Sequence, residues 1–117
     1  MGTLAAYALL LLAACLEAGG DALVRLGLHT HHGFGRIGLF LGGAAVLFVY
    51  GLSVNAPNWD FGRLLGVYVT LFFVVAQLLN FMLFGIKPGL PILIGGVLIV
   101  SGGAVMTIWA GRSAGLL

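Results

Sequence analysis

The sequence predicts an all-α membrane protein in which four transmembrane helices form one bundle. Residues of the AVILMFWYC class make up 62% of the chain and charged residues only 7%, whereas a soluble domain needs roughly 25% charged residues. Four apolar segments approach the ~20 residues that a helix needs to cross a bilayer. No segment alternates apolar and polar residues as a barrel strand would.

The predicted helices cover residues 3–26, 37–54, 61–84 and 91–110, within a single domain of residues 1–117. Three breaks separate these helices. The first is rich in Gly and His, and the second ends in Asp60, a residue type that caps helix N-termini. The third holds Pro88 between two glycines, and Pro91 suits the first turn of the last helix.

Composition and spacing exclude several classes of protein. A net charge of +2 is too small for a nucleic-acid-binding surface. Cys15 is the single cysteine, so an intrachain disulfide is excluded. Residues 12–15 are similar to a lipoprotein cleavage motif, but no Lys or Arg precedes them, as a signal peptide would require. We therefore treat Cys15 as an apolar residue of the first helix.

The sequence contains no catalytic triad, phosphate-binding loop or cofactor motif. We therefore expect neither enzymatic activity nor a bound cofactor. His29, His31 and His32 cluster in the first break, but they lack a fourth ligand for a structural zinc site. We expect a solvated loop there and no metal.

The charges of the breaks barely select an orientation in the membrane. Four crossings place both termini on one side. Arg25, Arg36 and Lys87 belong to the opposite side, against Arg63 and Arg112 on the side of the termini. Because orientation follows an excess of Lys and Arg on the cytoplasmic side, three against two leaves dual insertion and a single orientation as alternatives.

The first predicted helix carries Glu17, Asp21 and Arg25 at four-residue spacing, which places them on one face. An acid near mid-bilayer costs ~2.5–3.5 kcal/mol on insertion scales and marks a functional site by default. We predict that Glu17 is a functional residue that binds and releases protons. Asp21 either shares this role or forms an ion pair with Arg25, since Asp followed by Arg at this spacing is a favourable orientation.

The third predicted helix carries a weakly polar stripe and one aromatic candidate. The stripe consists of residues at helical spacing: Gly66, Thr70, Phe73, Gln77 and Asn80. Amide and hydroxyl groups in hydrocarbon seek partners on other helices, so Thr70, Gln77 and Asn80 either hold helices together or line a substrate path. Tyr68, on a nearby face, is a candidate for stacking on a cationic substrate.

Glycine pairs predict close helix packing. Gly38 and Gly42 form a GxxxG pair in the second helix. The fourth helix carries two pairs at seven-residue spacing: Gly95, Gly96, Gly102 and Gly103. Small residues let helix backbones approach closely, within one chain or between chains.

Three segments together resemble the small multidrug resistance family of bacterial transporters, within the drug/metabolite transporter group. In residues 16–25 an acid, Glu17, is followed three residues later by Gly and eight later by Arg25. Residues 33–36 are similar to the family's Gly-Phe-x-Arg, in a loop about four residues longer. Residues 84–87, then Leu90-Pro91, Gly95, Leu98-Ile99 and Gly102, resemble its third loop and fourth helix. The resemblance covers most of the chain and its helix count.

The third helix departs from that family. Tyr68 takes the place of the family's Trp, and residues 70–72 replace its Gly-x-Gly. The aromatic grip on substrate and the helix kink are therefore not carried over. Residues 62–69 look closer to an uncharacterised small branch of the same superfamily.

The resemblance implies a proton-coupled transporter that exports cationic or lipophilic small molecules across the bacterial inner membrane. It also implies a homodimer, parallel or antiparallel, in which Glu17 of each chain faces a shared chamber. Two alternatives remain. The chain is a non-transporting accessory subunit or assembly factor of a larger membrane complex, or it is a lipid-carrier flippase.

Overall fold

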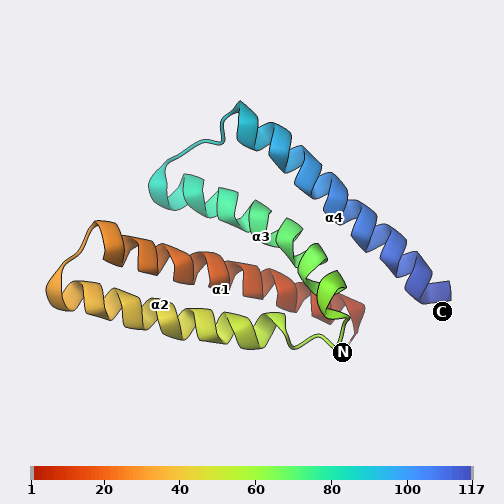
Figure 1. The fold of residues 1–117 in the computed structure, drawn as a ribbon, viewed down its shortest axis with the longest axis horizontal. Coiled ribbons are helices and arrows are strands. Elements are labelled where there is room, and N and C mark those ends of the chain that lie inside the picture. The colour runs from red at the N-terminus through yellow and green to blue at the C-terminus, as the bar shows by residue number, and fades with distance from the viewer. Residues whose placement is uncertain (1, 117) are drawn as a thin grey trace. The chain divides into compact units, whose positions relative to one another are not determined.

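Four helices make up the described chain. The computed structural model describes residues 2–116, with side chains up to Trp109. The helices are α1 (Thr3–His29), α2 (Gly33–Val54), α3 (Phe61–Phe84) and α4 (Leu90–Leu116) (Figure 1). Each is long and apolar enough to cross a bilayer, α4 over Leu90–Trp109, and the described residues include no strand. The predicted class, an all-α membrane protein with four transmembrane helices, is confirmed.

The helices pair as two hairpins. α1 and α2 form the first hairpin, which ends at Asn58, and α3 and α4 form the second, which begins at Trp59. Within each hairpin the two helices run antiparallel (Figure 1). Contact between α1 and α2 is more extensive than contact between α3 and α4. Large apolar side chains are exposed on all four helices, as expected for helices whose solvent is hydrocarbon.

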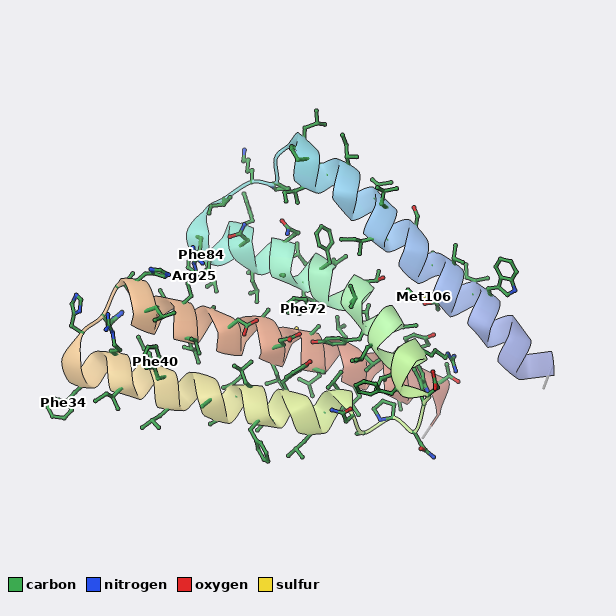
Figure 2. The ribbon with its side chains drawn as sticks, viewed as in Figure 1. Arg25, Phe34, Phe40, Phe72, Phe84 and Met106 are labelled. Atoms are coloured by element: carbon green, nitrogen blue, oxygen red, sulfur yellow. The ribbon has the colours of Figure 1, made fainter. Side chains whose placement is uncertain are left out.

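Glycines let the backbones of α1 and α2 approach closely. A Cβ atom added at Gly43 would lie 3.1 Å from the carbonyl oxygen of Gly20 and 2.7 Å from Cγ2 of Val24. A Cβ atom added at Gly27 would lie 2.8 Å from the ring of Phe40, which sits between the two helices in Figure 2. We call Gly20, Gly27 and Gly43 the first glycine seam.

The connection between α1 and α2 is shorter than predicted. α1 continues to His29 and α2 begins at Gly33, so residues 30–32 replace the predicted break of residues 27–36. That break was inferred from its glycines, but Gly27 is buried against α2, where only a small residue fits. Gly33 does serve the turn, because its φ of +61° is readily adopted only by glycine.

Arg36 folds back onto the C-terminal end of α1. Its Nε donates hydrogen bonds to the carbonyl oxygens of Gly27 (2.9 Å) and His31 (3.1 Å), and its Nη2 donates to that of Leu28 (3.2 Å). The last carbonyls of a helix have no partner within the helix, and the helix dipole favours a cation beside them. Arg36 therefore caps α1 and ties the first hairpin together at its loop.

The remaining boundaries lie close to the predicted ones. α3 covers the predicted residues, and the Asp60 carboxylate caps it by accepting a hydrogen bond from the backbone N–H of Arg63 at 3.1 Å. Gly85, at φ +66°, ends α3, and its N–H donates to the carbonyl of Phe81, which is the αL capping arrangement. α4 begins one residue before Pro91 and continues past the predicted end at residue 110.

The first glycine seam predicts unequal effects of alanine at two adjacent glycines. In Gly43→Ala the new methyl group would meet the backbone of α1, so we expect a loss of about 1–3 kcal/mol in unfolding free energy from overpacking. In Gly42→Ala the nearest atom, Cδ1 of Leu23, is 4.0 Å away, so little change is expected. Helix content followed by circular dichroism during denaturation in detergent measures both. Equal losses of unfolding free energy in Gly42→Ala and Gly43→Ala would contradict the close approach of the helices at Gly43.

The Arg36 cap predicts that lysine cannot replace this arginine. Arg36→Lys keeps the charge but loses the planar donor fork. We expect about 1–2 kcal/mol of destabilisation from the lost charge-assisted hydrogen bonds. The loss is smaller than at a buried site because two of the three bonds are exposed. Lys87→Arg, at an exposed loop position, is the control for exchanging the two cations. A melting temperature of Arg36→Lys equal to that of the wild type would show that the cap adds nothing.

Candidate functional site

Glu17 is placed at the middle of its membrane span. Because α1 continues to His29, Glu17 lies about halfway along the helix. Its side chain is half-buried. Ala13 and Gly20, one helical turn to either side, are both buried, so Glu17 continues a buried face of α1.

Asp21 and Arg25 lie one and two turns nearer the loop, and both side chains are exposed. Figure 2 places Arg25 near the loop end of α1. In the part of the chain that the structure describes, no hydrogen bond or ion pair is recorded between these two side chains. The ion pair, like the alternative role of Asp21 in proton binding, stays a prediction.

His29, His31 and His32 are all exposed, and the side chain of His31 contacts its neighbours. Nδ1 of His31 lies 2.7 Å from Oγ1 of Thr30, and that hydroxyl donates to the carbonyl oxygen of Leu26 at 2.6 Å. Among the described residues, no three His, Cys, Asp or Glu side chains are grouped for metal binding. These contacts extend the C-terminal cap of α1.

The polar stripe of α3 faces α4. Thr70 lies against Gly103, where an added Cβ would clash with its side chain, and its Oγ1 donates to the carbonyl oxygen of Ile99 at 3.4 Å. Phe73 covers Gly96, where an added Cβ would be 2.8 Å from the ring. Gly96 and Gly103, which we call the second glycine seam, therefore admit the larger residues of α3.

The two ends of this stripe differ. At Gly66 an added Cβ would lie 2.6 Å from Sδ of Met106, so the helices are also close there. Beyond Phe73, toward the loop, Gln77 instead borders an open groove. Asn80, one turn further, is half-buried and lies outside the groove.

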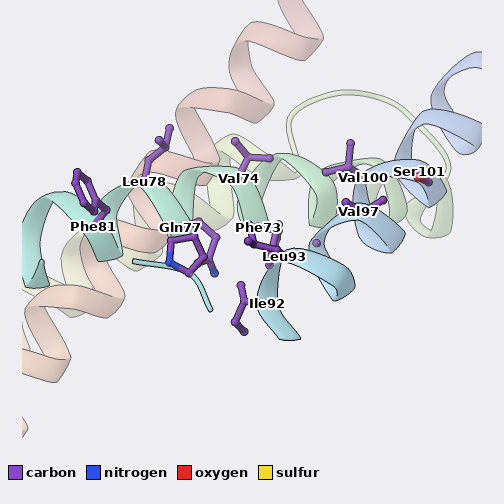
Figure 3. Close-up of a pocket in the computed structure, with 12 residues that line it drawn as sticks. Phe73, Val74, Gln77, Leu78, Phe81, Ile92, Leu93, Val97, Val100 and Ser101 are labelled. Carbon is purple, nitrogen blue, oxygen red and sulfur yellow. The ribbon is translucent and has the colours of Figure 1, made fainter. Parts of the chain in front are cut away.

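A groove lies between α3 and α4 of the second hairpin. It has a volume of about 550 Å³, and Figure 3 shows side chains of both helices around it. Its walls are apolar except for one amide, that of Gln77, and one hydroxyl, that of Ser101. Among the side chains that the structure describes, no charged one lines it.

Tyr68 lies off the polar stripe. It is only 4% exposed, and its ring stacks on Phe72 with the centroids 6.1 Å apart and the planes inclined by 30°. The cation–aromatic contact of this hairpin involves other residues, since the guanidinium of Arg63 lies 4.6 Å from the ring centroid of Trp59.

Four of the six predicted glycines lie off the seams, and Gly42 is one of them. A Cβ atom added at Gly38, Gly95 or Gly102 would meet no atom of its own hairpin within 4 Å. The glycines of α1 that do form a seam were missed, although their seven-residue spacing, Gly20 to Gly27, was a usable signal. The capping role of Arg36 was also missed, because that residue was considered only as a loop charge and as part of a family motif.

Comparison with known proteins identifies relatives among bacterial membrane proteins. The chain is 37% identical over 81 residues to a UPF0060 membrane protein of Rhodococcus erythropolis, covering 68% of this chain and 72% of the relative. It is 36% identical over 89 residues to a UPF0060 membrane protein of Kineococcus radiotolerans, covering 75% of this chain and 78% of the relative. No family model matches the chain, and no solved structure matches it.

The names of these relatives and the four apolar helices both indicate that the chain is a multi-pass integral membrane protein. Both relatives exceed 30% identity over more than two thirds of their own length. The chain belongs to the family of UPF0060 membrane proteins.

Proposed function

We propose that this chain is a small proton-coupled transporter of the small multidrug resistance type, which exports cationic or lipophilic small molecules as a homodimer. Glu17 is the shared site of protons and substrate. On this proposal the chain is a carrier and not an enzyme, and it needs no cofactor.

The position of Glu17 carries the proposal. A half-buried carboxyl group midway along α1 is costly in hydrocarbon, and such groups mark functional sites in membrane proteins. An anionic carboxylate in apolar surroundings attracts a cation, and a proton competes for the same oxygen atoms. Alternating exposure of such a site to the two sides of the membrane converts this competition into exchange.

The homodimer is supported by glycine faces that contact no other described part of their own hairpins. Gly38, Gly95 and Gly102 meet no atom of their own hairpins within 4 Å, and small faces of this kind favour contact between transmembrane helices. The near-balance of loop charges, three against two, suits two chains inserted in opposite orientations.

The same glycine faces favour a second candidate, a non-transporting subunit or assembly factor of a larger membrane complex. Purification in mild detergent separates the two. A transporter is expected to run alone as a small oligomer, whereas a subunit brings partner proteins in fixed proportion.

The transporter proposal predicts that Glu17→Gln abolishes coupled exchange. The purified protein is reconstituted into liposomes, a pH gradient is imposed, and both internal pH and uptake of ethidium, a lipophilic cation, are followed. The wild type should exchange protons for ethidium, whereas Glu17→Gln should fall to the level of protein-free liposomes because it cannot bind either ion. Glu17→Asp, which keeps the acid, is the matched control. Wild-type rates in Glu17→Gln would refute the mechanism.

The antiparallel form predicts dual insertion. Reporters fused after Leu117 should then be detected on both sides of the membrane. Replacing His29 and His32 by lysine adds two positive charges to the first loop and should draw that loop to the cytoplasm, which locks one orientation. A wild-type reporter confined to one side would eliminate the antiparallel dimer and leave the parallel one.

A further inference from the structure

The groove of the second hairpin has the size and lining of a small-molecule site. Ligand pockets commonly enclose ~300–1,000 Å³ and combine apolar walls with a few polar groups that fix orientation. The groove of about 550 Å³ has this composition. Phe73 and Gly96 are part of its lining, which extends from Pro88 of the connecting loop to Ser101 of α4.

The lining defines the chemistry of the occupant. With no charged residue on its walls, the groove offers nothing to neutralise an ion taken from water. With only Gln77 and Ser101 as polar residues, it offers too few partners for a chain of ordered waters. A neutral and mostly apolar molecule fits both limits.

Gln77 supplies the orienting group. Its side chain extends from α3 into the space beside Leu93 and Ile92 (Figure 3), and its amide has no hydrogen-bond partner among the described residues. An amide in hydrocarbon is stabilised by a partner, and its NH₂ donates to an acceptor such as a carbonyl oxygen.

The route into the groove is lateral. Residues along its rim are exposed, including Leu78 at 58% and Val97 at 66%. In a helix that spans the membrane, such residues face hydrocarbon, so an apolar molecule dissolved in the bilayer reaches the groove without crossing water.

We propose that the groove between α3 and α4 is a binding site for a neutral, mostly apolar molecule that enters from the bilayer and accepts a hydrogen bond from Gln77. The site goes beyond the transport proposal and does not depend on Glu17, which lies in the other hairpin.

Photolabelling with benzophenone tests the site. Benzophenone is neutral and apolar, carries one carbonyl acceptor, and inserts into nearby C–H bonds when irradiated. With the full chain in lipid nanodiscs, we expect saturable labelling of residues in the groove, located by mass spectrometry. Dicyclohexyl ketone should compete about fivefold better than dicyclohexylmethane, which lacks the carbonyl, since one hydrogen bond contributes roughly that much.

Two pairs of variants make the test specific. Gln77→Leu should remove the advantage of the ketone, whereas Asn80→Leu, an amide on the same helix outside the groove, should retain it. Val97→Trp should fill the groove and abolish labelling, whereas Leu98→Trp, an adjacent exposed position outside the groove, should not. If Val97→Trp fails to fold, the Gln77 and Asn80 pair decides.

Three results would overturn the proposal. Labelling that does not saturate and is spread over all lipid-facing residues would indicate simple partition into the bilayer. Absence of label from the groove of the wild type would mean that protein covers it. An unchanged ketone preference in Gln77→Leu would remove the role of the amide. Glu17→Gln should leave the labelling unchanged, so failure of the transport mechanism is distinguishable from failure of this site.

Discussion

Close approach of helix backbones at glycine is the constraint on which each hairpin depends. In hydrocarbon, apolar side chains gain nothing by leaving the solvent, so helices associate through packing and hydrogen bonds. At Gly20 and Gly43 the backbones of α1 and α2 come near enough that an added methyl group would touch a carbonyl oxygen. At Gly96 and Gly103 the backbone of α4 gives room to Phe73 and Thr70.

The two hairpins differ in how their helices are connected beyond the glycine seams. In the first, the glycine seam is supplemented at the loop by Arg36, whose hydrogen bonds to the end of α1 hold the two helices together where the chain reverses. In the second, a longer connection of residues 85–89 separates the helices at the loop. The groove extends from Pro88 at that end to Ser101, alongside the second glycine seam.

Whether a polar side chain of α3 finds a hydrogen-bond partner on α4 depends on how close the two helices are at that point. Thr70 is satisfied across the second seam by the carbonyl of Ile99, whereas Gln77, beyond the end of that seam, faces the groove. Glu17 sits at mid-span, between the buried residues Ala13 and Gly20. Thr70 therefore holds helices together, while Gln77 is left without a partner among the described residues of α4.

By itself the sequence determined the number of helices, the membrane as solvent and most helix ends, because hydropathy, caps and turn residues act locally. Asp60, Gly85 and Pro91 marked their boundaries correctly. The tertiary structure decided which glycines are in contact, since Gly42 and Gly43 differ by one residue but by about 100° around the helix. It also decided that Gly27 lies inside α1, that Arg36 is a cap, and that Gln77 faces a groove. Each of these depends on how close a second helix comes, which no single segment of sequence encodes.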